Sequence, residues 1–198
     1  PRLDVPVPVP VPVPALPPPP PRDPWLFEAS AAFVTALGLQ PRASLGVGVN
    51  AILEPPHFVP LEGFSAIFFD STAAGDNGSY VTLDVAYVGG GLCPLRSRGR
   101  TLHLFACIES HLGLTRARTG GFEASPTEAF RPIVDSALSG RATVRIGGPF
   151  ALRAGLSAVL PLLRYRYTLQ RDDGSRGTAF VASPIAGVLD IGIGLALP

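Results

Sequence analysis

Apolar and polar residues alternate along most of the chain after residue 24, and the final stretch shows this best. Between Val181 and Leu197, apolar residues hold most odd positions while small or polar residues hold the even ones. Alternation at period two is typical of a strand whose two faces meet different surroundings. Similar runs recur along the chain and predict eight strands, at about 25–34, 43–54, 61–70, 80–89, 101–115, 134–146, 150–167 and 181–197.

The segments between these runs contain the residues that favour turns and loops. Compact turns are predicted at 55–60, 94–100 and 147–149, and loops at 70–79, 116–132 and 170–177, of which 116–132 is the longest. The apolar positions shift by one residue after Pro161, which predicts a β-bulge in the seventh strand. In the fourth strand the apolar set Val81, Leu83, Val85 and Tyr87 is expected to face outward.

An even number of strands with alternating short and long connections predicts an all-β fold, an eight-stranded antiparallel up-and-down transmembrane β-barrel. Hydrophobic residues make up 46% of the chain and charged residues only 16%. Yet no window approaches the roughly 18 to 20 consecutive apolar residues of a transmembrane helix. Strands that are apolar on one face reconcile the two observations, although a soluble β-sandwich would share the composition.

Residues 1–24 form a separate, proline-rich segment that precedes the expected barrel domain at 25–198. Proline fixes φ and lacks an amide donor, so this segment is expected to be an extended polyproline II arm of roughly 60 to 70 Å. It is read as a tether to an upstream periplasmic segment or as a disordered tail. A start at Pro1, without an apolar leader, is expected of a mature or excised chain.

Charge and cysteine content narrow the setting further. The net charge of +1 gives no case for a nucleic-acid partner. Cys93 and Cys107 flank one predicted turn, which favours a disulfide in an oxidising compartment such as the periplasm or cell surface. Such a bridge would close a loop of about 15 residues and contribute about 3 kcal/mol.

Taken with the aromatic residues near the strand ends (Trp25, Phe27, Phe68, Phe69, Tyr165 and Tyr167), the alternating pattern over residues 25–198 resembles the small eight-stranded outer-membrane barrels of Gram-negative bacteria. The likeness is to the OmpA/OmpX-type group, and to proteobacterial and myxobacterial barrels with a proline-rich leader. It implies a location in the outer membrane with periplasmic termini. It also implies contacts with outer-membrane lipid and the barrel assembly machinery, and an upstream domain or a peptidoglycan-associated partner.

The polar positions opposite the apolar faces are expected to point into the barrel as a paired ionic network, because buried charges survive only when paired. This interior set comprises Glu28, Asn50, Glu54, Asp84, His103, Glu109, His111, Arg141, Arg145, Arg153 and Asp190.

Catalysis finds little support in this set. Glu109 and His111 share a face and form a conceivable acid–base pair, but no nucleophile motif accompanies them. His103 and His111 lie roughly 26 Å apart along one strand and do not share a metal ion. We therefore expect no cofactor, no metal site and no enzyme. The leading hypothesis is a structural, anchoring or surface-interaction barrel, and the alternatives are a narrow porin-like channel or a lipid-binding or lipid-modifying barrel.

Overall fold

The computed structural model describes residues 24–74, 78–121, 127–170 and 176–197 of the chain. These residues form ten β-strands and no helix, so none of them belongs to a helix suited to crossing a membrane. The proline-rich arm expected at 1–24 lies, except for Pro24, outside the described residues.

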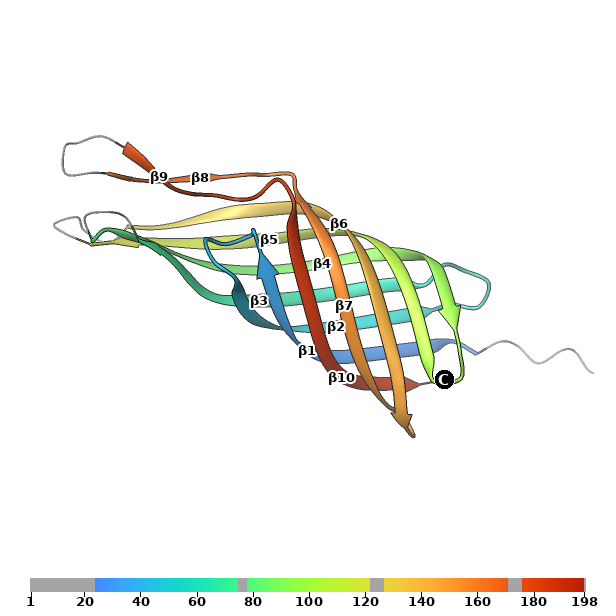
Figure 1. Ribbon diagram of the computed structural model, residues 1–198. Helices are drawn as coiled ribbons and strands as arrows, with labels where there is room; N and C mark the ends of the chain where they lie inside the picture. Colours follow the sequence, from blue (N-terminus) through green and yellow to red (C-terminus); the bar gives the residue numbers. More distant parts are fainter. Residues whose placement is uncertain (1–23, 75–77, 122–126, 171–175, 198) are drawn as a thin grey trace, which may run out of the picture.

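Eight of the strands close into an antiparallel barrel, as the alternation predicts (Figure 1). From β1 to β7 each strand pairs with the next one in the chain, and β10 pairs with both β7 and β1 to complete the circle. The barrel strands are β1 (Leu26–Leu37), β2 (Ser44–Glu54), β3 (Leu61–Ala74), β4 (Tyr80–Arg98), β5 (Leu102–Gly120), β6 (Thr127–Gly147), β7 (Phe150–Pro161) and β10 (Ala186–Leu197).

The stagger of the strands sets the width of the barrel. Starting at Ala31 and following partners through β2 to β5 leads to Val134 in β6, whereas following them through β10 and β7 leads to Val144. The two end points lie ten residues apart, which is the shear of the barrel. Eight strands with this stagger are tilted by roughly 35 to 45° and leave an interior that side chains fill.

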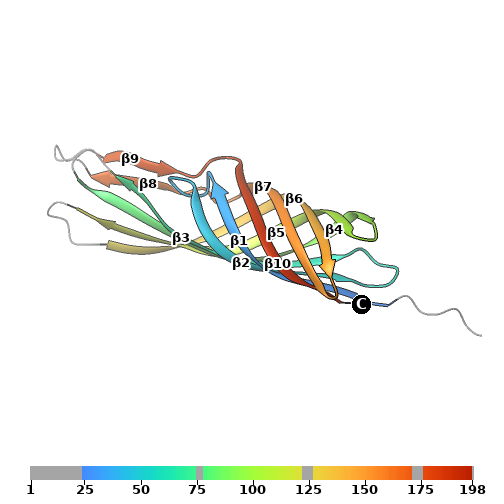
Figure 2. The same ribbon diagram turned by 60° about the horizontal axis from the view of Figure 1, so that its bottom comes forward.

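The two ends of the barrel differ. At the end that we call the turn end, β1 begins, β10 ends, and the connections 55–60, 99–101 and 148–149 are short. At the opposite loop end, β3 to β6 continue well past the other strands (Figures 1 and 2). β4, β5 and β6 have 19, 19 and 21 residues, about twice the 9 to 11 needed to cross a bilayer. We call this projecting sheet the extension.

The remaining two strands correct the predicted course of the chain after Pro161. β8 (Arg166–Gln170) and β9 (Arg176–Val181) form a separate antiparallel hairpin rather than parts of barrel strands. β7 therefore ends at Pro161, and no bulge carries it on to Tyr167. The hairpin lies along the extension (Figures 1 and 2), where Tyr167 and Phe180 pack against Val81, Leu83 and Ala117. The predicted last strand began at 181 because the apolar residues of β9 continue the alternating pattern of β10.

Several predicted loops are also strand. The loop predicted at 116–132 belongs largely to β5 and β6, and the one predicted at 70–79 belongs partly to β3. The turn predicted at 94–100 shrinks to 99–101 because β4 continues to Arg98. The residues of the first two segments pair in the extension and those of the third at the turn end, because strand hydrogen bonds do not require an apolar face.

The outward face of the barrel carries an apolar belt. Phe33, Leu112 and Ile193 expose 77%, 62% and 68% of their surface, and similar side chains surround the ring on the other strands. On the extension side, the belt gives way to charge beyond Leu114, where Arg116 and Arg118 follow on the same face of β5. An outward apolar band followed by polar residues is the surface that a bilayer requires.

Candidate functional site

Charged and polar side chains from five strands meet in the middle of the barrel, around Arg141 of β6. Its guanidinium donates to Glu62 Oε1 at 3.0 Å, to Asp190 Oδ2 at 2.7 Å and to Glu109 Oε1 at 3.1 Å. Ser157 Oγ accepts a further bond at 3.1 Å. These partners come from β3, β10, β5 and β7 because alternate residues of every barrel strand point inward. All are buried, and we call them the central cluster.

Glu62 connects the central cluster to a second arginine on β7 and to β2. Its Oε1 also accepts from Arg153 Nη2 at 2.7 Å and from Asn50 Nδ2 at 2.5 Å. The side chain of Glu62 has 0% exposure, and that of Arg153 has 3%. A carboxylate buried this completely needs several hydrogen-bond donors, because removing a charged group from water costs several kcal/mol.

His111 adjoins the central cluster on the side of the loop end. Its Nδ1 lies 2.5 Å from Asp135 Oδ1, and its Nε2 lies 2.9 Å from Glu109 Oε2. Ser139 Oγ donates to the other oxygen of Glu109. The rings of Phe64 and Tyr87 pack against the imidazole, with centroids at 5.7 and 5.1 Å. Both ring nitrogens are therefore engaged, and the serine bonds the carboxylate rather than the histidine.

A second set of ionisable groups lies near the turn end. Glu28 Oε1 of β1 lies 2.8 Å from His103 Nδ1 of β5, across the lumen. Glu54, the last residue of β2, pairs through Oε2 with Arg96 at 3.1 Å and with Arg98. The two arginines are about half exposed, whereas both glutamates and the histidine are buried. We call Glu28, Glu54 and His103 the turn-end cluster.

The predicted disulfide is confirmed. Cys93 and Cys107 are bonded, with their Cα atoms 3.8 Å apart. Both side chains are buried inside the barrel beside Ile52 and Phe105, between the turn-end and central clusters. Cys93 lies on the inward face because β4 keeps a continuous register from Tyr80 to Leu92, and a bulge after Leu92 shifts the register beyond it. The bridge therefore crosslinks two barrel strands inside the lumen.

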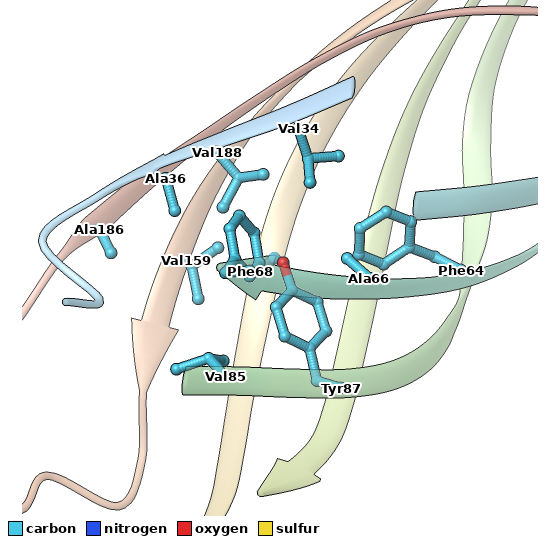
Figure 3. Close-up of a cluster of buried hydrophobic side chains, with 11 residues drawn as sticks. Val34, Ala36, Phe64, Ala66, Phe68, Val85, Tyr87, Val159, Ala186 and Val188 are labelled. Carbon is cyan, nitrogen blue, oxygen red and sulfur yellow. The ribbon is translucent and has the colours of Figure 1, made fainter. Parts of the chain in front are cut away.

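Apolar side chains fill the half of the lumen toward the loop end (Figure 3). Val34, Phe68, Val85, Val159 and Val188 belong to this layer and expose no more than 3% of their surface. Gln40 closes it from the β1–β2 connection by donating to the Leu83 carbonyl at 2.8 Å. The interior is thus divided into an ionic half and an apolar half, both occupied by side chains.

The structure buries nine of the eleven residues predicted for the interior. Arg145 also belongs to the inward set but is half-buried. Asp84 is on the outer face, where Arg118 pairs with both Asp84 at 3.0 Å and Asp70 at 2.7 Å. The buried nine are Glu28, Asn50, Glu54, His103, Glu109, His111, Arg141, Arg153 and Asp190.

The error at Asp84 follows from the face assigned to β4. Val81, Leu83, Val85 and Tyr87 are buried, so they point inward, and Asp84 between them points out. The apolar layer of the lumen and the hairpin cover these side chains on the inside. An apolar face is therefore not always the lipid face in this barrel.

Two central residues were not anticipated from the sequence. Glu62 lies in β3, where Phe64 and Phe68 share its inward face. Asp135 lies near the start of the predicted sixth strand, on the same face as Arg141, but it was not included in the interior set. A charged residue in phase with apolar ones is the only sequence signal for Glu62, and it is weak.

The buried clusters offer little to a substrate. The carboxylates and guanidinium groups of the central cluster bind one another, and His111 is held between two carboxylates. Glu109 and His111 do form the pair expected from their spacing, but each exposes only 2% of its surface. A general base needs to reach the proton that it abstracts, and these groups do not.

A closed eight-stranded antiparallel barrel with an apolar outer belt and a filled, charged interior has the architecture of small outer-membrane barrels. Solved structures of such proteins share the fold. A major outer membrane protein of Thermus thermophilus superposes with a TM-score of 0.63 at 11% identity, over 87% of this chain and 99% of that one. Ail, the attachment invasion locus protein of Yersinia pestis, gives 0.50 at 11% identity over 87% and 97%.

No family model matches the sequence, and no curated protein matches it either. At 11% identity the structural likeness concerns the fold alone.

Proposed function

We propose that this chain is an integral β-barrel of the Gram-negative outer membrane with an anchoring, structural or surface-interaction role. The main support for this proposal is that the barrel has an apolar belt on its outer face and a lumen filled by side chains. A water-soluble monomer rarely exposes apolar patches beyond a few hundred Å², whereas here large apolar side chains line the outer face of every barrel strand. Outer-membrane lipid is the partner that this surface fits.

The position of the extension supports a surface role. β3 to β6 project beyond the belt at the loop end, and the β8–β9 hairpin packs against them. A platform of this kind presents ordered polar residues to the medium when the turn end faces the periplasm. Ail, whose crystal structure includes the heparin analogue sucrose octasulfate, shares the fold. Contact between the extension and molecules outside the cell is part of this proposal.

In the same orientation the proline-rich segment 1–24 precedes β1 on the periplasmic side. We propose that it tethers the barrel to an upstream periplasmic domain or a peptidoglycan-associated partner, and that the barrel assembly machinery inserts the chain. A stiff segment of roughly 60 to 70 Å suits such a spacer.

The alternatives find less support. A channel needs a continuous polar lumen, and the apolar layer around Phe68 and Val188 interrupts it. Lipid modification needs an accessible nucleophile or base, and the ionisable groups of the central cluster are buried and paired. Purified protein in planar bilayers should therefore show no unitary conductance, and stable conductance steps would restore the channel reading.

Cysteine labelling tests location and orientation together. Tyr80→Cys places a thiol on the extension, and His57→Cys places one in the turn at 55–60. The native cysteines are bonded to each other and buried. A membrane-impermeant maleimide should label Y80C on intact cells, and H57C only after the outer membrane is permeabilised. Reversed labelling would invert the orientation, and recovery of both variants in the soluble fraction would contradict the membrane location.

A further inference from the structure

We propose that the turn-end cluster, Glu28, Glu54 and His103, binds one Zn²⁺ ion. The cluster brings one imidazole nitrogen and two carboxylates together from β1, β2 and β5, with one donor atom of each within 4.8 Å of the others. Each of the three side chains is more than nine-tenths buried. The site is independent of the proposed membrane role, since it rests only on the barrel geometry.

The hydrogen bonding of the two glutamates points to a ligand. Glu28 Oε1 faces His103 Nδ1, and Glu54 Oε2 faces the two arginines. The second oxygens, Glu28 Oε2 and Glu54 Oε1, are buried and accept no hydrogen bond from any described residue. A buried carboxylate oxygen without a donor costs about 1 to 3 kcal/mol. A divalent cation between the two carboxylates would satisfy both oxygens at once.

The donor types select the metal. Mg²⁺ and Ca²⁺ prefer all-oxygen sets, whereas imidazole is a ligand for Zn²⁺ and its neighbours in the first transition row. One histidine and two carboxylates leave a fourth tetrahedral position for water, with metal–ligand bonds of about 2.0 to 2.2 Å. Three donors within 4.8 Å need only small side-chain rotations to reach those distances.

Arg96 and Arg98 bear on the charge of the site. They contact only Oε2 of Glu54 and so hold the carboxylate in place while leaving Oε1 without a hydrogen bond, as outer-shell groups hold metal ligands. Their charges oppose a cation, but both side chains are about half exposed and solvent screens them. Glu28 has no arginine hydrogen-bond partner among the described contacts, and its contact there is with His103.

The other donor group of the barrel does not meet the same requirements. Glu62, Cys93 and Cys107 are equally close together. Their sulfurs form a disulfide and are not thiolates, and Oε1 of Glu62 is already bound by Arg141, Arg153 and Asn50. His111 is flanked by carboxylates on opposite ring nitrogens, so its two partners do not converge on one point.

The test is titration of the folded, detergent-solubilised barrel with Zn²⁺ in a calorimeter. We expect one ion per chain. E28Q and H103Q should each weaken binding by at least roughly 100-fold, more than an outer-shell change costs. H57A is the matched control, because His57 is an exposed histidine in a turn at the same end and its loss should leave the affinity unchanged. Unaltered binding in E28Q and H103Q, or loss in H57A, would overturn the assignment.

A second measurement covers the case in which a variant does not fold. X-ray absorption at the zinc edge of the unmodified protein should show a single imidazole among light oxygen ligands. A spectrum without imidazole scattering, or with two imidazoles, contradicts this site, as does the absence of saturable Zn²⁺ binding in the unmodified protein.

Discussion

Arg141→Met tests how far the central cluster stabilises the barrel. The substitution keeps much of the length of the side chain but removes the cation that binds Glu62, Glu109 and Asp190. The side chains involved are no more than 3% exposed, so solvent does not replace the lost bonds. Breaking a buried ion pair from one side typically costs about 3 to 5 kcal/mol. Three carboxylates lose a partner here, so we expect R141M to fall at the upper end of that range.

Urea unfolding of the folded barrel in detergent measures this cost, with the fluorescence of Trp25, the only tryptophan, as the signal. For a slope of about 2 kcal/mol per molar urea, the midpoint should fall by about 2 M. R118Q is the matched control, because Arg118 also binds two carboxylates but is 40% exposed. Exposed pairs are worth about 1 kcal/mol or less.

A double variant separates charge from packing. Asp190 is one of the carboxylates that R141M leaves unpaired, so R141M/D190N should lose less stability than the sum of its single variants, by about 1 kcal/mol or more. Stability of R141M within about 1 kcal/mol of the parent, or a loss no greater than that of R118Q, would refute the role assigned to the central cluster.

Three further outcomes are expected. Replacing Cys93 and Cys107 by serine should cost about 3 kcal/mol in the same urea assay, and an unchanged midpoint would contradict a stabilising bridge. Gly155→Ala directs a methyl group at Asp190 and Arg141, whereas the methyl group of Gly140→Ala meets nothing within 4 Å. Only the first substitution should lower the free energy of unfolding, by about 1 to 3 kcal/mol. Burial raises the pKa of Tyr167 in the hairpin. The hairpin should therefore resist proteolysis below the ordinary tyrosine pKa of about 10, and it should lose this resistance as the pH rises through the higher pKa of Tyr167 in the folded protein. The Y167F variant has no ionisable hydroxyl at this position and should not show this loss of resistance at alkaline pH.

Alternation was enough to predict the barrel, because every barrel strand keeps one face against a uniform outer surround. The lipid-facing positions Phe33, Leu104 and Ile191 are exposed as expected. The apolar face of β4 was assigned to the wrong side because the lumen beside Val85 and Tyr87 is itself apolar. Alternation shows that a strand has an apolar face, but it does not show whether that face points into the lumen or away from it, and at Asp84 the polar face is the outer one.

The course after Pro161 was misread for a related reason. The hairpin strands β8 and β9 have five and six residues, and their alternation continues the pattern of the strands on either side. The contents of the clusters depend on the stagger of the ring, which no local pattern encodes. Glu28 and His103 lie 75 residues apart and meet only because of the shear. Individual interior residues were therefore predictable, but their partners were not.

The way in which the ionic bonds cross the lumen has a consequence for assembly. Arg141 on β6 binds Glu62 on β3, and Glu28 on β1 faces His103 on β5, so the bonded residues belong to strands that are not neighbours in the ring. A growing, still open sheet keeps these groups apart and hydrated, however well its adjacent strands are paired. Only when β1 meets β10 does the curvature bring the partners together and expel the water. We therefore expect no stable, partly closed barrel during insertion, because in such a state the charged side chains would stay hydrated and unpaired inside the bilayer.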